Sequence, residues 1–351
     1  MNAREPSKRA KELDVLRGAS ALAVIVLHAG SHPLTDQSAS GHASWALLVP
    51  NVMARFAVPV FMILSGMGLT LSARRDEGYP QFVRRRLSSI VPAYVAWSLI
   101  YAWLFPRHEM VSVKTLLAGL LTGNTSNHLY FVPAVLQLYI LYPVLRSFAR
   151  SPWGVVGCCV LSWSMIWLSG ELTSTPLGAF VDDVLPLRWL GFFVLGIWFA
   201  NARSSAPRLL ARAQAIAPVV AIAALACMVA IVQRVISQTA DIDVALGAAE
   251  PLVLVYSVGV LLWSTNVSFG DGPIVRFLTF VSDHSYAVYL SHIALLRVCV
   301  LSLQAIASES THVMMFSVSV VLGIPLALAT AVLSDGAKRR YHLLQHSVND
   351  V

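Results

Sequence analysis

Long apolar runs alternate with short polar connections along the whole chain. A helix needs about 20 mostly apolar residues to cross the hydrocarbon core of a bilayer, and the runs approach or exceed that length. The pattern therefore predicts a series of membrane-spanning helices. We expect ten, at residues 13–33, 46–72, 87–105, 128–147, 153–170, 185–202, 214–236, 247–266, 285–306 and 313–334.

The composition indicates a chain that is solvated largely by lipid. Of its 351 residues, 57% are hydrophobic and 12% are charged, and the mean hydropathy is +0.68. Soluble domains are about 45–50% apolar and about 25% charged, so this chain has too little polar surface to cover a water-exposed body of its size. We expect an all-α, polytopic integral membrane protein. A soluble enzyme, a fibrous protein and a disordered chain are excluded.

The basic residues predict the orientation of these helices. Most of the 25 Lys and Arg residues lie in the N-terminal segment and in alternate connections, and such clusters mark the cytoplasmic side. Residues 1–12 and the tail at 335–351 are therefore expected in the cytoplasm. The longest connections, 73–86 and 106–127, are too short for a second domain, so residues 1–351 should form a single transmembrane domain.

The net charge of +7 does not predict a nucleic-acid partner, because the basic residues lie between apolar segments rather than on one water-facing surface. The first apolar run lacks a cleavage site of small residues directly after it, and we expect it to be retained as a span. We expect no metal site from the cysteines, because all four lie inside apolar runs without zinc-type spacing: Cys158, Cys159, Cys227 and Cys299.

The first predicted span carries two costly polar residues, Arg17 near its cytoplasmic end and His28 in its interior. At eleven residues apart they project from nearly the same helix face, about 16 Å from each other along the axis. Arg17 alone would equally suit a helix-end arginine that reaches the cytoplasmic interface. His28 would suit a hydrogen bond between packed helices, but catalysis or substrate contact is the stronger interpretation.

The segment LDVLRGASALAVIVLH, residues 13–28, resembles the opening helix of the membrane-bound acyltransferase 3 family, whose motif is Arg or Lys, ten residues and then His. The resemblance covers nearly the whole chain, and the family's ten helices with both termini inside agree with the arrangement expected above. Further segments resemble the family in order: VPVFMILSGMGL, FVRRRLSSIVPAY, HLYFVPAVLQLYILYPVL, LRWLGFFVLGIWFA and SDHSYAVYLSHIALL.

The resemblance implies a multi-pass O-acyltransferase in the inner, cytoplasmic membrane of a bacterium. It would transfer an acyl group, with acetyl as the first expectation, from cytoplasmic acetyl-CoA or another acyl-CoA. The acceptor would be a hydroxyl of a glycan, a lipid-linked sugar or another carbohydrate-containing molecule. A hydroxyl attacks a thioester poorly unless a base takes its proton, and we expect His28 to be that general base. A route through an acyl-imidazole on His28 stays open.

Four basic residues and one serine are expected to bind the donor. Arginine grips phosphate through bidentate hydrogen bonds, so Arg17 would guide the acyl-CoA inward, and Arg84, Arg85 and Arg86 would hold its nucleotide end. The three consecutive arginines equally suit a lipid-headgroup anchor. Ser65 would hydrogen-bond the thioester carbonyl, although a Ser-Gly pair in a membrane helix often marks close helix packing.

A second group of residues is expected to contact the acceptor or to line the cavity: Arg55, His128, Tyr130, Tyr286, Tyr289 and His292. Arg55 also suits a buried ion pair, as do Arg188 and Arg297, and His128 and Tyr130 suit an interfacial aromatic belt. No residue on the same helix explains what orients His28, since Asp14 is about 21 Å away along the axis. Candidates elsewhere are Asp182, Asp183 and Glu250.

Two other functions compete with acyl transfer. A transporter or exporter of a glycan or small solute would use the same intramembrane polar groups as a pathway, and it would move its substrate without an acyl donor. The other class of membrane O-acyltransferase, with an Asn and His pair, would have a different helix order and no Arg-x10-His motif.

Overall fold

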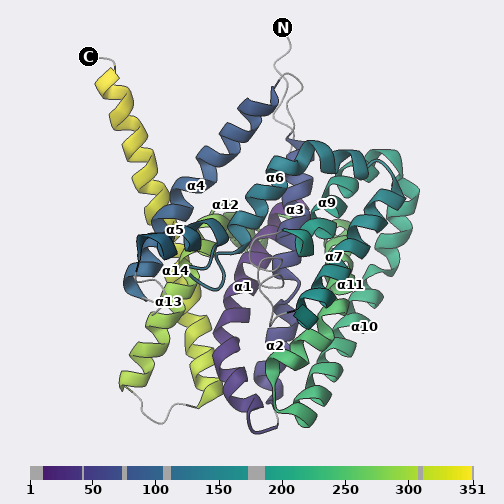
Figure 1. The fold of residues 1–351 in the computed structure, drawn as a ribbon, viewed down its shortest axis with the longest axis vertical. Coiled ribbons are helices and arrows are strands. Elements are labelled where there is room, and N and C mark those ends of the chain that lie inside the picture. Colours follow the sequence, from purple (N-terminus) through teal and green to yellow (C-terminus); the bar gives the residue numbers. More distant parts are fainter. Residues whose placement is uncertain are drawn as a thin grey trace. The chain divides into compact units, whose positions relative to one another are not determined.

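The computed structural model describes residues 11–41, 43–72, 77–105, 112–172, 186–306 and 311–349. Over these ranges the regular structure is helical and there is no strand (Figure 1), which confirms the predicted all-α class. The helices in chain order are α1 (Lys11–Ser38), α2 (Trp45–Ala54), α3 (Ala57–Leu71), α4 (Tyr79–Leu104), α5 (Val113–Thr122), α6 (Phe131–Phe148), α7 (Pro152–Leu172), α9 (Leu187–Ser205), α10 (Pro207–Thr239), α11 (Ile242–Asn266), α12 (Pro273–Asp283), α13 (Ser285–Ile306) and α14 (His312–Asn349).

Each of the ten predicted spans coincides with helix, and seven segments of the described chain are long and apolar enough to cross a membrane. The helices α7, α9 and α11, which coincide with the other three predicted spans, are not among the seven. The count of ten spans and the cytoplasmic location of the termini therefore stay predictions. The seven segments are Lys11–Ser38, Trp45–Leu71, Tyr79–Leu104, Phe131–Phe148, Pro207–Thr239, Ser285–Ile306 and His312–Ser334.

The predicted span at 46–72 is not one continuous helix, because the helix is interrupted at Arg55 and Phe56, between α2 and α3. Pro59 has no N–H and cannot donate to the carbonyl of residue 55, so a break costs no hydrogen bond at this point. Proline is well tolerated in the first turn of the helix that follows. Arg55, a charged residue in an otherwise apolar segment, therefore lies at the interruption between the two helices.

The described chain forms two compact units. The first unit comprises Met1–Ala57 and Ala217–Val351, so both ends of the chain contribute to it, and the second unit comprises Val58–Ile216. The boundaries fall within the first turn of α3 and within α10. The single-domain organisation expected from the connection lengths stays a prediction.

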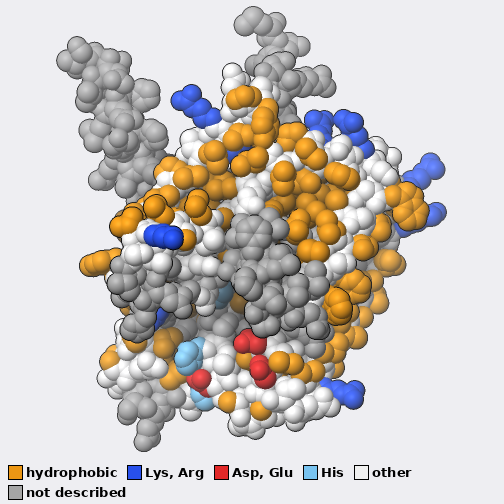
Figure 2. Space-filling view, viewed as in Figure 1, with side chains coloured by type: hydrophobic (Ala, Val, Ile, Leu, Met, Phe, Trp, Pro, Cys, Tyr) orange, Lys and Arg blue, Asp and Glu red, His pale blue; other side chains and the backbone are white. Residues whose placement is uncertain are grey.

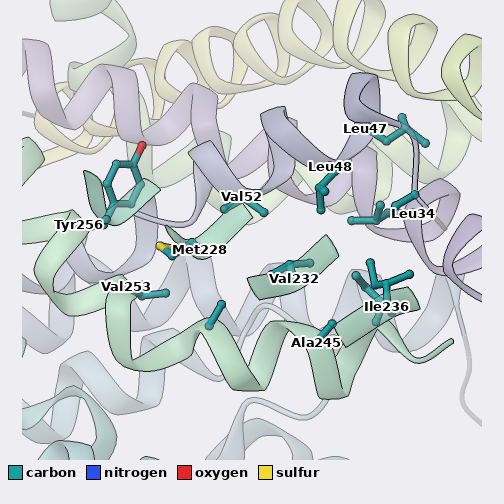
Figure 3. Packing of buried hydrophobic residues seen from close by; sticks show 14 of the residues in the cluster. Leu34, Leu47, Leu48, Val52, Met228, Val232, Ile236, Ala245, Val253 and Tyr256 are labelled. Carbon is teal, nitrogen blue, oxygen red and sulfur yellow. The ribbon is translucent and has the colours of Figure 1, made fainter. Parts of the chain in front are cut away.

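A hydrophobic cluster joins α1, α2, α10 and α11 in the first unit (Figure 3). Leu47, Leu48 and Val52 come from α2, and fully buried side chains such as Met228 and Val232 come from α10. Burying a side chain of this size contributes about 1.5–3 kcal/mol. The cluster therefore fixes the position of α2 within the unit, and thereby also the position of the helix interruption at Arg55.

The start of α1 packs closely against α12. Gly18 lies against the carbonyl of Leu278, in a space that a Cβ atom would fill. Lys11 forms an ion pair with Asp271, just before α12 begins, and this ammonium holds the pKa of the Asp271 carboxyl below its usual value. The close contact at Gly18 places α12 directly beside Arg17.

Helices α3 and α9 make a similarly close contact in the second unit. Gly66 faces the carbonyl of Phe193, and Gly196 faces the carbonyl of Ile63. Small residues let the backbones of membrane helices approach in this way. The Ser-Gly pair of α3 thus has a packing role at its glycine.

Large apolar side chains lie on the exterior of the described residues, and hydrophobic atoms make up much of the surface that Figure 2 shows. Trp153 is 82% exposed and Trp103 is 80% exposed. Contiguous apolar surface of this kind is rare on soluble monomers and suits contact with lipid.

We expect Gly66→Ala to destabilise the protein by about 1–3 kcal/mol, because the added methyl group collides with the Phe193 backbone. Gly68 is the matched control, since it lies two residues further along α3 and a Cβ there meets no atom within 4 Å. Gly68→Ala should leave stability unchanged or raise it slightly. Thermal unfolding in detergent measures both, and equal midpoints for the two variants would contradict the packing.

Candidate functional site

His28 lies in the interior of α1, and its side chain is half-buried in the first unit. His292 on α13 is fully buried, and the centroids of the two imidazole rings are 5.2 Å apart with planes inclined by 44°. The two rings are in contact at this separation, and Nε2 of His292 makes no hydrogen bond in the described structure. The two residues are far apart in sequence, and the packing of α1 against α13 brings them together.

His292 is held by its own helix. Its Nδ1 lies 2.6 Å from the carbonyl oxygen of Tyr289, and the rings of these two residues are 5.9 Å apart. A carbonyl oxygen only accepts hydrogen bonds, so Nδ1 is the donor and carries the hydrogen. In the neutral ring, Nε2 is then the nitrogen with the available lone pair. The hydrogen bond to Tyr289 therefore selects one tautomer of His292.

The helix α2 and the residue directly after it bring two polar side chains near this part of α1. Asn51 is 1% exposed, and its Nδ2 donates to the carbonyl of Leu27 at 3.0 Å. Arg55 follows Asn51 by four residues, which places both on one side of the chain, and its guanidinium is close enough for its charge to act on His28. The imidazole of His292 thus lies beside His28, the charge of Arg55 acts on it, and Asn51 bonds the backbone of α1 one residue before it.

Contacts with α11 fix the end of α2 that carries Arg55. The hydroxyl of Tyr256 donates to the carbonyl of Met53 at 2.9 Å, and this satisfies one of the carbonyls left over at the end of the helix. The Tyr256 ring also meets Phe56 edge to face, with centroids 6.1 Å apart. The backbone that carries the Arg55 side chain is therefore held in place on both sides of this residue.

Arg17 is paired within the first unit. Its Nη1 donates to Asp14 Oδ1 at 3.3 Å, and the same oxygen accepts a hydrogen bond from Ser282 at 3.5 Å. The side chains of Arg17 and Asp14 are mostly buried, at 24% and 13% exposed. This carboxylate limits the positions that the guanidinium can take, and Ser282 links the pair to α12.

Tyr286 and Tyr289 lie on α13 with His292, at the spacing that places residues on one helix face. Tyr286 is half-buried and Tyr289 is buried. Six predicted site residues thus belong to the first unit: Arg17, His28, Arg55, Tyr286, Tyr289 and His292.

The three consecutive arginines belong to the second unit and have different surroundings. Arg84 is exposed, whereas Arg85 makes a bidentate pair with Glu77, with both nitrogen–oxygen distances at 2.7 Å. Arg86 donates to Ser72 at 2.8 Å, and its guanidinium lies 5.9 Å from the ring centroids of Phe82 and Tyr139. Protein groups thus engage Arg85 and Arg86, and Arg84 has the most exposed guanidinium position of the run.

Ser65, His128 and Tyr130 also belong to the second unit. Ser65 is half-buried on α3, while His128 is 3% exposed and its Nδ1 lies 3.1 Å from the hydroxyl of Ser126. The half-buried ring of Tyr130 stacks on that of Trp189, with centroids 6.2 Å apart. His128 is therefore enclosed by its own unit, and Tyr130 has the more open side chain.

Among the carboxylates considered for orienting His28, Asp182 and Asp183 lie outside the described residues, and Glu250 is half-buried on α11. Within the described ranges, no group of three or more His, Cys, Asp and Glu side chains is arranged to hold a metal ion.

Comparison with protein families adds the decisive observation. The family model described as acyltransferase domain, Acyl_transf_3, matches residues 10–334. The chain belongs to the acyltransferase 3 family. It is therefore a membrane acyltransferase, and the match extends over all the candidate residues described above. No curated protein and no solved structure matches this acyltransferase significantly.

The sequence of the acyltransferase suggested the important residue types but not their neighbours. It did not reveal that His292 lies beside His28, that Asp14 holds Arg17, or that Asn51 contacts the helix at Leu27. One signal was available for Asn51, since it is a costly polar residue four positions before Arg55 in an apolar run. The contact between the two histidines depends on tertiary packing and left no such signal.

Proposed function

We propose that this acyltransferase moves an acyl group, with acetyl as the first expectation, from a cytoplasmic acyl-CoA to a hydroxyl of a glycan or other carbohydrate-containing acceptor. His28 acts as the general base. The observation that carries the proposal is the half-buried imidazole of His28 inside α1, beside His292 and within range of the charge of Arg55. A base in this position is shielded from bulk water and yet retains some accessible surface.

The reaction forms one bond and breaks another. The hydroxyl oxygen of the acceptor attacks the carbonyl carbon of the thioester while His28 takes the hydroxyl proton. The bond between carbon and sulfur then breaks, and the proton passes from His28 to the departing sulfur of CoA. Arg55 supplies a positive charge near the place where negative charge develops on the carbonyl oxygen.

The other assignments are also proposals. Arg17 guides the phosphates of the donor, and Ser65, Arg84, Arg85 and Arg86 contribute to donor binding. His128, Tyr130, Tyr286, Tyr289 and Arg55 contact the acceptor or line the cavity. The fully buried His292 belongs to the lining and not to the acceptor contacts. The enzyme belongs in the inner membrane of a bacterium, where acyl-CoA is available on the cytoplasmic side.

We expect His28→Ala to lower acetyl transfer by about 10²–10⁴-fold, which is the usual contribution of a general base. The test uses membrane vesicles from a bacterial host, labelled acetyl-CoA and the envelope glycans of those vesicles, and it measures base-labile label in the glycan fraction. His32→Ala is the matched control, because His32 is exposed one turn further along α1. Equal transfer by His28→Ala and the parent would rule out His28 as the base.

We expect Arg17→Ala to raise the KM for acetyl-CoA by about 10–100-fold and to leave the KM for the acceptor nearly unchanged. One charge-assisted hydrogen bond contributes about 1.5–3 kcal/mol, which corresponds to that range. Arg276→Ala is the control, since Arg276 is an exposed arginine on α12 in the same unit. An equal rise in both KM values would argue against a role of Arg17 in donor binding.

A further inference from the structure

The environment of His28 leaves open which group orients its ring. An imidazole that acts as a base needs one nitrogen with a lone pair, and a hydrogen bond at the other nitrogen decides which nitrogen that is. In serine hydrolases, a carboxylate provides this hydrogen bond and also stabilises the ring once it has gained a proton. For His28, the structure places the imidazole of His292 alongside, with ring centroids 5.2 Å apart.

The neighbours of His28 differ in whether they can accept a hydrogen bond from it. The Arg55 guanidinium has donors only. Asn51 already directs its Nδ2 toward the carbonyl of Leu27, so its remaining group is the Oδ1 oxygen. His292 donates from Nδ1 to the carbonyl of Tyr289, so its Nε2 is an acceptor in the neutral ring. The ring of His292 is also fully buried and fixed in orientation.

We propose that His292 is a positioning residue for His28: in the working enzyme its Nε2 accepts a hydrogen bond from the adjacent His28 ring and thereby fixes the tautomer of His28. The other nitrogen of His28 then carries the lone pair that takes the proton of the acceptor hydroxyl. This inference rests on the proposed function for its catalytic meaning. The hydrogen bond itself can be measured without any activity.

The chain of contacts runs in one direction. The carbonyl of Tyr289 fixes Nδ1 of His292 as a donor, which leaves Nε2 of His292 as an acceptor. The tautomer of His28 with its hydrogen on the nitrogen that faces His292 is then the favoured one. When His28 gains the second proton during the reaction, its ring donates to His292 more strongly, because hydrogen bonds from charged donors are about twice as strong as neutral ones. No proton has to leave His28 for His292.

Two amide substitutions separate this role from a structural one. A glutamine amide reaches about the place of Nε2, so His292→Gln keeps an acceptor for His28 and loses the contact with Tyr289. An asparagine amide reaches about the place of Nδ1, so His292→Asn keeps the contact with Tyr289 and loses the acceptor. If His292 positions His28, then His292→Gln should retain kcat within about 10-fold and His292→Asn should lose about 100-fold or more, with the KM for acetyl-CoA unchanged in both.

The opposite order, with His292→Asn active and His292→Gln inactive, would show that the ring only braces α13 and would overturn the proposal. Parental kcat in both variants would also overturn it. Thermal unfolding in detergent identifies any variant that has lost its fold.

A second measurement keeps the test independent of activity. Nitrogen NMR of protein labelled with [15N]histidine distinguishes protonated from unprotonated ring nitrogens, and His28→Ala assigns the signals of that ring. We expect one tautomer of His28 in the parent, in His292→Gln and in Asn51→Ala, and a mixture of tautomers in His292→Asn. A mixture in the parent, or one that arises in Asn51→Ala alone, would refute the positioning role. A single tautomer in a parent protein that transfers no acetyl group would instead count against the proposed function.

Discussion

A polar side chain inside an apolar helix bundle is costly unless it finds a partner within that bundle, and Arg17 and His28 are among the side chains of α1 in this position. The first unit answers this constraint at two levels. Near the start of α1, Asp14 and Ser282 form a hydrogen-bonded group with Arg17. Further along the helix, His292 lies against His28 and Arg55 is within electrostatic range. Apart from Asp14 on α1 itself, the partners come from α12, from α13 and from the residue after α2, so the polar groups of α1 help to specify which segments surround it.

The backbone of the first unit supports this arrangement. A close contact at Gly18 holds α12 beside Arg17. The apolar cluster, to which α2, α10 and α11 contribute, fixes the position of the helix interruption at Arg55. Tyr256 closes the end of α2 by a hydrogen bond to Met53. The candidate site residues thus lie on segments whose packing is set by small residues and by buried apolar side chains, which is the condition for holding a site in constant geometry.

The sequence alone predicted a large part of this account, and the missing parts share a physical cause. Hydrophobic runs located helices at all ten expected segments, because an apolar stretch of this length has few alternatives. The break at Arg55 was not predicted, although Pro59 made it inexpensive, since apolar patterning gives no sign of where a span is interrupted. The Arg17 and His28 spacing led to a family resemblance, and the family match confirms it. The contact of His28 with His292 was out of reach, because it joins residues 264 positions apart through tertiary packing.

The most direct test of the account is a cryo-electron-microscopy structure of the protein in lipid nanodiscs with S-acetonyl-CoA, a ketone analogue of acetyl-CoA that cannot transfer its acyl group. We predict that the ketone carbon faces the accessible side of the His28 ring and leaves room between them for the acceptor hydroxyl. That hydroxyl must come within about 3–3.5 Å of the carbon and within hydrogen-bond reach of the ring nitrogen, with His292 on the other side of the ring. An analogue bound with its ketone away from His28, while that ring faces only lipid or protein, would contradict the assignment of His28 as the reaction centre.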